Sequence, residues 1–310
     1  MGNIVLQKKP EEIKKMKEYY SKFLIDKLPP GSIFAAKTAS CAITAYKSGK
    51  VLFQGKDGES EAAKWGTAVE PSAKKKTGTT SSPSHLPSNI SEMSIIGSDE
   101  VGTGDFFGPI TVVAAYVRRE DIPILKELGV QDSKNLKDDK IIEIAKQLVT
   151  FVPHSLLTLH NEKYNQMQMK GMSQGKLKAL LHNQAINHVL EKIAPEKPEA
   201  ILIDQFAKEE IYYAHLKGQK NIMRENVLFS TKAEGIHLGV AAASMIARYA
   251  FVRHFENLSK RAGFTIPKGA GAGVDKAAAR LILEKGLDVL PEFVKLHFAN
   301  TEKAKKIARV

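Results

Sequence analysis

A stretch nearly without core-forming residues, PSAKKKTGTTSSPSHLPSN over residues 71–89, divides the sequence into two parts of unequal length. It is rich in Ser, Thr, Pro and Lys, and only Ala73 and Leu86 are apolar candidates. Such a segment cannot bury enough apolar surface to offset the entropy of ordering. We therefore expect a small domain over residues 1–70, a flexible linker over 71–90 and a larger domain over 91–310.

The positive charge of the chain points to a polyanionic partner. The formal net charge is +12 over 310 residues, and nucleic acids are the leading polyanions in a cell. Residues 1–90 hold 15 lysines, no arginine and 8 acidic residues, so this short part carries more than half of the excess. Lysine suits contacts to a phosphate backbone that read no sequence. A merely solvated basic surface is the alternative.

The single cysteine, Cys41, rules out an internal disulfide and a cysteine-built zinc cage. No apolar run approaches the roughly 18 residues needed to span a bilayer, and the first residues lack a signal-peptide core. The expected protein is cytoplasmic, binds no membrane, and is a monomer without an obligate protein partner.

The first part of the chain predicts a small α+β domain. Residues 10–28 read as a helix with an apolar stripe, and Pro29-Pro30-Gly31 ends it. Two strands follow over 42–47 and 51–55, joined by a hairpin turn. We expect the helix to cover one face of this sheet and leave the other face free.

The second part alternates strands and helices, which predicts an α/β fold with a mixed sheet and helices on both faces. The expected strands lie at 94–98, 110–118, 155–160, 200–203 and 226–229. The expected helices lie at 136–149, 173–193, 209–217 and 234–255.

Acidic residues stand where these elements end or begin. Asp99 and Glu100 follow an apolar strand, Asp204 follows another, and Glu234 opens a helix. Sites in open sheets form at strand ends, so these carboxylates can converge. Clustered carboxylates need a cation, and oxygen ligands suit magnesium or manganese. Paired ions of this kind catalyse phosphodiester hydrolysis, which favours a nuclease.

Each acid also has a structural interpretation: Asp99 would satisfy backbone amides in a turn, and Asp204 would be an ordinary strand-end residue. Asp99 and Glu100 would point to opposite faces of a regular strand, so a shared site requires the strand to end or bulge there. Glu234 lies three residues after Thr231, the spacing of a helix capping box. Arg248 lies almost four helical turns beyond Glu234, and a surface charge or backbone anchor is the expected role.

The motifs in their order are more specific than any one acid. They are Asp99-Glu-Val-Gly-Thr-Gly104, Asp132-Ser-Lys-Asn-Leu136, Ile203-Asp204, and Glu234 ahead of Ala241-Ala-Ala-Ser-Met-Ile-Ala-Arg248. Together they resemble the type 2 ribonuclease H family over about residues 94–297. The resemblance implies a ribonuclease H-like fold.

Three positions resemble the HIII branch of that family more than the HII branch. Thr103 stands where HII typically has arginine, Glu234 where HII usually has aspartate, and Ala270 where HII has a tyrosine that recognises a lone ribonucleotide. The N-terminal extension is similar in size and pattern to the TATA-box-binding-protein-like domain of HIII.

The resemblance implies an endonuclease that cuts the RNA strand of RNA–DNA hybrids with two metal ions, leaving 5′-phosphate and 3′-hydroxyl ends. Its ions would be Mg²⁺, with Mn²⁺ as a substitute, and it would favour runs of ribonucleotides. The implied metal-binding and catalytic residues are Asp99, Glu100, Asp204 and Glu234. The implied substrate contacts are Gly102, Thr103, Gly104, Ser133 and Lys134.

Other functions stay open at this point. An HII-like enzyme would cut at single ribonucleotides. A different nuclease of the same broad fold, such as a strand-transfer or junction-resolving enzyme, would lack the Asp132–Leu136 motif. A nucleic-acid-binding protein without activity would use the acids structurally.

Overall fold

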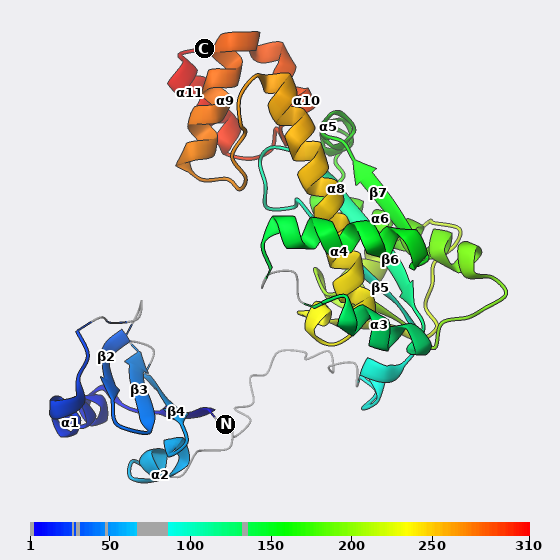
Figure 1. Cartoon of the computed structure of the whole chain (residues 1–310). Helices are drawn as coiled ribbons and strands as arrows, with labels where there is room; N and C mark the ends of the chain where they lie inside the picture. Colours follow the sequence, from blue (N-terminus) through cyan, green and yellow to red (C-terminus); the bar gives the residue numbers. More distant parts are fainter. Residues whose placement is uncertain (1–2, 27, 29–31, 47–48, 67–85, 132–135) are drawn as a thin grey trace. The chain divides into compact units, whose positions relative to one another are not determined.

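The computed structural model describes residues 3–26, 28, 32–46, 49–66, 86–131 and 136–310 (Figure 1). The chain forms two compact units, Met1–Ser81 and Ser82–Val310. Most of the predicted linker lies outside the described residues. At its described end, Leu86 and Ile90 pack into the core of the second unit. Among the described residues, no helix is long and apolar enough to cross a membrane.

The first unit is a small α+β domain with a four-stranded antiparallel sheet in the order β1-β4-β3-β2. Its strands are β1 (Asn3–Gln7), β2 (Ser32–Lys37), β3 (Cys41–Tyr46) and β4 (Lys50–Gly55). Its helices are α1 (Pro10–Tyr19), α2 (Gly58–Ala63) and the 3₁₀ turn Ser21–Phe23. The sequence predicted β3 and β4 but missed β1, β2 and α2.

The helix predicted over residues 10–28 ends at Tyr19, nine residues early. The 3₁₀ turn follows, and Leu24 then pairs with Ala36 of β2 as an isolated antiparallel bridge. The stripe that suggested one long helix therefore divides between a helix and a sheet edge. Its first half, Ile13 and Met16, packs in the domain core as expected.

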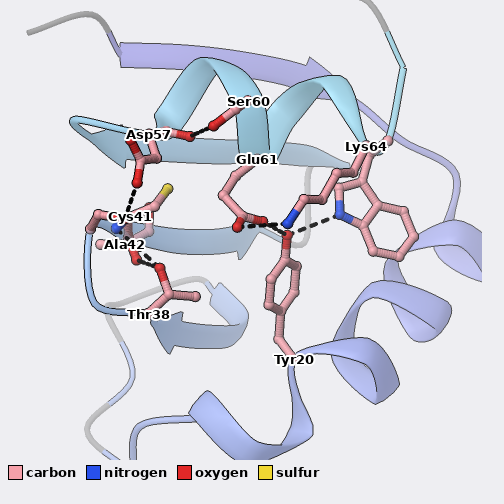
Figure 2. A network of polar contacts seen from close by, with 10 residues as sticks. Tyr20, Thr38, Cys41, Ala42, Asp57, Ser60, Glu61 and Lys64 are labelled. Atoms are coloured by element: carbon pink, nitrogen blue, oxygen red, sulfur yellow. Dashed lines mark hydrogen bonds and ion pairs between the residues drawn. The ribbon is translucent and has the colours of Figure 1, made fainter.

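A polar network ties the end of α1 to α2 (Figure 2). The Tyr20 hydroxyl donates to Glu61 at 2.8 Å and accepts from the Trp65 indole at 3.0 Å. Lys64 donates to the other oxygen of Glu61 at 2.8 Å. Tyr20 is 1% exposed, so its hydroxyl needs these partners, and they fix α2 against the core.

The second unit has a five-stranded mixed sheet flanked by helices, which confirms the predicted α/β class. The strands are β5 (Ile95–Val101), β6 (Ile110–Val117), β7 (His154–Leu159), β8 (Ala200–Asp204) and β9 (Val227–Ser230). The helices are α3 (Ile122–Glu127), α4 (Asp138–Phe151), α5 (Asn161–Met169), α6 (Gln174–Ile193), α7 (Glu209–His215), α8 (Leu238–Ala262), α9 (Ala272–Lys285), α10 (Leu290–Phe293) and α11 (Asn300–Ala308).

The sheet order is β7-β6-β5-β8-β9. β6 is antiparallel to both β5 and β7, whereas β8 is parallel to β5 and β9. Helices α8 and α4 pack on one face, and α6 with α7 packs on the other. Gly97 lets α8 approach β5, because a Cβ there would stand 2.2 Å from the backbone of Gly239.

The second half of α8 leaves the sheet and carries the C-terminal helices α9, α10 and α11 (Figure 1). Phe251 and Phe255 of α8 pack there with Phe106 and Phe107 from the turn between β5 and β6. This turn is the glycine-rich motif of the sequence. The C-terminal helices therefore support the back of the motif.

The helix predicted from residue 234 begins later. Glu234 lies in a 3₁₀ turn, Ala233–Gly235, and α8 starts at Leu238. The side chain of His237 caps α8, with Nδ1 accepting the N–H of Gly239 at 2.8 Å. The Thr231–Glu234 spacing is therefore not the cap of this helix.

Candidate active site

One cavity of about 400 Å³ gathers three of the four predicted acids. Its lining includes Asp99, Glu100 and Asp204. The parallel pairing of β5 and β8 explains this, because Ser98 pairs with Ile203 and the acids follow on both strands. The carboxyl ends of parallel strands meet at one edge of a sheet.

Asp99 and Glu100 reach this cavity from a regular strand. The pairing of β5 with β6 continues without a shift through Asp99, Glu100 and Val101. Of the two expected alternatives, the bulge is absent, whereas β5 does end at Val101, directly after Glu100. The neighbouring strand β8 ends at Asp204, so side chains from both faces of the sheet line the same cavity at this edge.

The two neighbouring acids have opposite electrostatic surroundings. Burial, together with the negative charges of Glu100 and Asp204, raises the pKa of Asp99 to about 8. Burial also acts to raise the pKa of Glu100, but hydrogen bonds and charge from His182 and Lys178 outweigh it and lower that pKa. The surroundings of Glu100 thus favour its anionic form, whereas burial and the neighbouring carboxylates favour the protonated form of Asp99.

Glu234 is buried, with 4% of its surface exposed, and it is not part of the cavity lining. It lies one residue after Ala233, whose N–H donates to Asp204 Oδ1 at 2.9 Å. This bond holds the 3₁₀ turn of Glu234 against the end of β8. The structure thus places Glu234 in a turn that is bonded to Asp204, and the cavity lining does not include Glu234.

The glycine-rich turn forms another part of the lining, with Gly102, Thr103 and Gly104. Gly102 has φ +97°, and a Cβ there would stand 2.3 Å from the carbonyl oxygen of Pro109. At Gly104 a Cβ would meet no heavy atom within 4 Å, so packing does not require glycine there. Open space beside backbone is what close approach of a ligand needs.

Two cations that the sequence analysis did not assign to the site also line the cavity. Arg248 was predicted to be a surface charge or a backbone anchor; its side chain is 30% exposed, and both Arg248 and Lys268 are among the residues that line the cavity. Asp138 holds both: Arg248 Nε donates to Oδ1 at 2.8 Å and Lys268 Nζ to Oδ2 at 2.6 Å. Nothing in the sequence around Arg248, on a helix, or Lys268, in a loop, indicated that both would bind Asp138.

Lys178 and His182 of α6 are further site residues that sequence reasoning missed. They donate to the two oxygens of Glu100. Their i, i+4 spacing was the only available signal, and it is common in helices. Ser133 and Lys134, predicted to contact a phosphate, lie outside the described residues.

The donor set fits a hard divalent cation. Asp99, Glu100 and Asp204 offer only oxygens, and burial together with the charges of the other two acids raises the pKa of Asp99, an effect that a bound cation would oppose. Within the described ranges, no three His, Cys, Asp or Glu side chains converge into a ready ion site. One reason is that both oxygens of Glu100 are directed to α6.

Comparisons with known proteins agree with this arrangement. The family model for ribonuclease HII matches residues 96–301, and a domain of unknown function (DUF3378) matches residues 3–78. Ribonuclease HIII of Bacillus subtilis (strain 168) is 59% identical over 310 residues, covering 99% of this chain and 98% of that protein. Ribonuclease HIII of Bacillus mycoides (strain KBAB4) is 58% identical over 309 residues, covering 99% of each.

Solved structures give the same family. The crystal structure of Bst-RNase HIII in complex with Mn²⁺ matches with a TM-score of 0.70 and 47% identity, covering 99% of both chains. Ribonuclease H2 from Pyrococcus horikoshii OT3 matches 70% of this chain and 99% of its own, with a TM-score of 0.58 and 22% identity, which shows a shared fold. The chain therefore belongs to the ribonuclease HII family, and within it to the ribonuclease HIII enzymes.

Proposed function

We propose that this enzyme cuts the RNA strand of RNA–DNA hybrids by hydrolysis that depends on divalent ions, leaving 5′-phosphate and 3′-hydroxyl ends. The observation that carries the proposal is the cavity where Asp99, Glu100 and Asp204 meet the glycine-rich turn. A set of buried and half-buried carboxylates beside open backbone suits a phosphodiester with its ions. The Mn²⁺ in the Bst-RNase HIII structure supports a divalent ion.

The ions would be held by Asp99, Glu100, Asp204 and Glu234, with Mg²⁺ as the proposed metal and Mn²⁺ as a substitute. When bound, such ions activate water and stabilise the leaving oxygen. Glu234 would join the set from its 3₁₀ turn, which the bond from Ala233 N–H to Asp204 keeps beside β8.

Arg248 and Lys268 would bind phosphates of the substrate at the cavity. Their shared anchor Asp138 presents both cations on the same side. Asp138, which begins α4, lies two residues after the Asp132–Leu136 motif in the sequence, and we propose that Ser133 and Lys134 of that motif also contact phosphate. Arginine suits bidentate binding of phosphate, whereas lysine acts as a point charge.

Discrimination between RNA and DNA would occur at the glycine-rich turn. The open space at Gly104 permits backbone of this turn to approach the minor groove. Thr103 is held in place by its carbonyl oxygen, which accepts from Gln174 Nε2 at 3.2 Å. A backbone that is held in place close to the minor groove can hydrogen-bond to 2′-hydroxyl groups, which only the RNA strand carries.

We further propose that the first unit binds the hybrid without reading its sequence. On its sheet, Phe34 and Ile43 face the helices and the core. Strand alternation places Lys37, Lys50 and Gln54 on the opposite face, and all three are exposed. Lysines on a free sheet face would raise affinity in a salt-dependent way.

Preference for runs of ribonucleotides over a single one would follow from Ala270. This residue has no hydroxyl or ring to recognise a lone ribonucleotide, and its carbonyl oxygen accepts from Asn300 at 2.9 Å. An enzyme that cuts at single ribonucleotides is the alternative for the same site. A monomeric state and a cytoplasmic location stay predictions from the sequence.

The test is an end-labelled cleavage assay with three substrates: an RNA–DNA hybrid, a DNA duplex holding four consecutive ribonucleotides, and one holding a single ribonucleotide. Each is incubated with Mg²⁺, with Mn²⁺ and with chelator, using the wild type and Asp99→Asn. We expect metal-dependent cutting of the first two, abolished by the substitution and weak on the third. Efficient cutting at the single ribonucleotide would favour the alternative, and no cutting of any hybrid would refute the proposal.

A further inference from the structure

Both carboxylate oxygens of Glu100 accept hydrogen bonds from side chains of α6, a helix that carries none of the four acids. Lys178 Nζ donates to Oε1 and His182 Nε2 to Oε2, each at 2.8 Å. The two donors lie one helical turn apart, so one face of α6 presents both to the strand. Glu100 is 10% exposed in its side chain, and the pair supplies the partners that a buried carboxylate needs.

Contacts at both ring nitrogens and at one ring face hold the side chain of His182 in place. Its side chain is fully buried, and its second ring nitrogen lies 2.7 Å from Ser98 Oγ. Ser98 precedes Glu100 by two residues on β5, so both side chains face α6. The ring of Phe206 stacks on His182 with centroids 5.1 Å apart and planes at 27°. Because a carboxylate only accepts, Nε2–H must be the donor to Glu100.

Lys178 is held less firmly. Its side chain is 12% exposed, and its ammonium group lies 4.2 Å from the centroid of the Phe206 ring. A lysine carries its charge on four flexible methylene groups, so Lys178 can move without a change in the helix. Phe206 follows Asp204 by two residues, so the same ring connects this pair of donors with the end of β8.

We propose that His182 is a permanent positioning residue for Glu100, whereas Lys178 is an exchangeable counter-cation that gives way when a divalent ion binds the acids. The proposal rests on the metal-dependent function proposed above. Two cations at one carboxylate repel each other, so the ion and the Lys178 ammonium compete. Without an ion, Lys178 balances the charge of Glu100, and His182 keeps the carboxylate aimed along the sheet edge.

The test measures Mn²⁺ binding to the full chain without nucleic acid, by the electron paramagnetic resonance signal of free Mn²⁺. Lys178→Met removes the competitor, and we expect binding about 5-fold tighter than in the wild type. His182→Leu removes the hold on Glu100, and we expect binding about 10-fold weaker. His182→Gln keeps an N–H donor near the Nε2 position and should restore most of the affinity.

Two further variants keep the test decisive. Lys176→Met removes the same charge two residues away on α6 and should leave Mn²⁺ affinity within about 2-fold of the wild type, since Lys178 and His182 are the donors to Glu100. Ser98→Ala removes only the hydroxyl behind His182 and should weaken binding in the same direction as His182→Leu, by about 3-fold. Thermal unfolding in chelator identifies any variant that does not fold, and Ser98→Ala then replaces His182→Leu.

If the Lys178→Met variant binds Mn²⁺ as weakly as the His182→Leu variant, the proposed exchange of Lys178 for the metal ion is wrong, because Lys178 would then support Glu100 permanently. Unchanged affinity in Ser98→Ala and His182→Leu would overturn the role of His182. The wild type is also assayed for cutting of a hybrid. A wild type that binds Mn²⁺ and does not cut refutes the proposed function, whereas one that binds and cuts leaves the variants to decide this inference.

Discussion

Arg248 and Asp138 are 110 residues apart in the chain, yet Arg248 Nε lies 2.8 Å from Asp138 Oδ1 beside the acidic cavity. Asp138 begins α4 and Arg248 lies within α8, so the packing of these helices creates the pair. The second oxygen of Asp138 accepts from Lys268. The cavity lining therefore combines the carboxylates of β5 and β8 with two cations, Arg248 of α8 and Lys268 of the loop that follows it, and Asp138 of α4 binds both cations.

Arg248→Gln should raise KM for an RNA–DNA hybrid about 10-fold, because a charged hydrogen bond to phosphate contributes about 1.5–3 kcal/mol. Arg253→Gln is the matched control, since it removes an arginine of the same helix whose exposed side chain pairs with Glu256. Steady-state cleavage assays check both. Equal KM values for the two variants would mean that Arg248 does not contact substrate.

Lys295→Met should destabilise the protein by about 2–4 kcal/mol, because it leaves two buried carbonyl groups without their donor. Lys295 is fully buried, and its Nζ donates to the carbonyl oxygens of Asp105 at 2.8 Å and Gly108 at 2.5 Å. Burial lowers the pKa of this lysine to about 7. Urea unfolding measures the loss, with exposed Lys303→Met as control. A variant as stable as the control would show that the anchor contributes nothing.

His237 should make stability depend on pH. Burial disfavours the charged imidazolium and lowers the pKa of His237 to about 4, and the unprotonated Nδ1 accepts the Gly239 N–H. The unfolded chain takes up this proton near pH 6.5, so the contribution is complete above 6.5 and is lost as the pH falls through 4. The difference between the two pKa values corresponds to about 3 kcal/mol.

The check for His237 is urea unfolding of the wild type and His237→Asn at pH 7 and pH 4.5. Asparagine is a good N-cap and does not titrate, so the variant should lose less stability over this range. Because all other titratable groups are the same in both proteins, the difference between their losses of unfolding free energy isolates the contribution of His237. Equal losses would contradict the role assigned to this cap.

Charge on the sheet face that carries Lys37 and Lys50 should act on affinity rather than on chemistry. Replacing both Lys37 and Lys50 with glutamine should raise KM, leave kcat unchanged and lower the salt slope of binding by up to about 2. Lys14 and Lys17, exposed on α1, give a double variant with the same loss of charge. Equal effects from both double variants would indicate general attraction and no defined binding face.

The sequence predicted the strand ends that carry Asp99, Glu100 and Asp204, because short apolar runs identify buried strands. It did not predict how Asp99 and Glu100 share a cavity, since this depends on where the neighbouring strand β8 ends. The pattern of apolar residues within one strand contains no information about where the neighbouring strand of the sheet ends. Of the two expected solutions to the alternation of side chains, a strand end and a bulge, the structure has the strand end, at Val101.

The polar partners of the acids were harder to predict for a similar reason. His182 lies on a long helix, and only the packing of α6 over β5 brings it to Glu100. Arg248 and Lys268 likewise depend on Asp138, which comes from a third element. In the first unit, β1 pairs with β4 and β2 pairs with β3, and the hairpin turn that identified β3 and β4 in the sequence has no counterpart at β1.

The central claim is that the four acids form one metal-dependent catalytic set. Single-turnover cleavage of a labelled RNA–DNA hybrid in Mg²⁺ tests it with Asp99→Asn, Glu100→Gln, Asp204→Asn and Glu234→Gln. Asp139→Asn, an exposed acid in the first turn of α4, is the control. We predict a loss of at least about 1,000-fold for the four variants and less than about 2-fold for the control. Wild-type rates for Asp99→Asn and Asp204→Asn would contradict the assignment of this cavity as the active site.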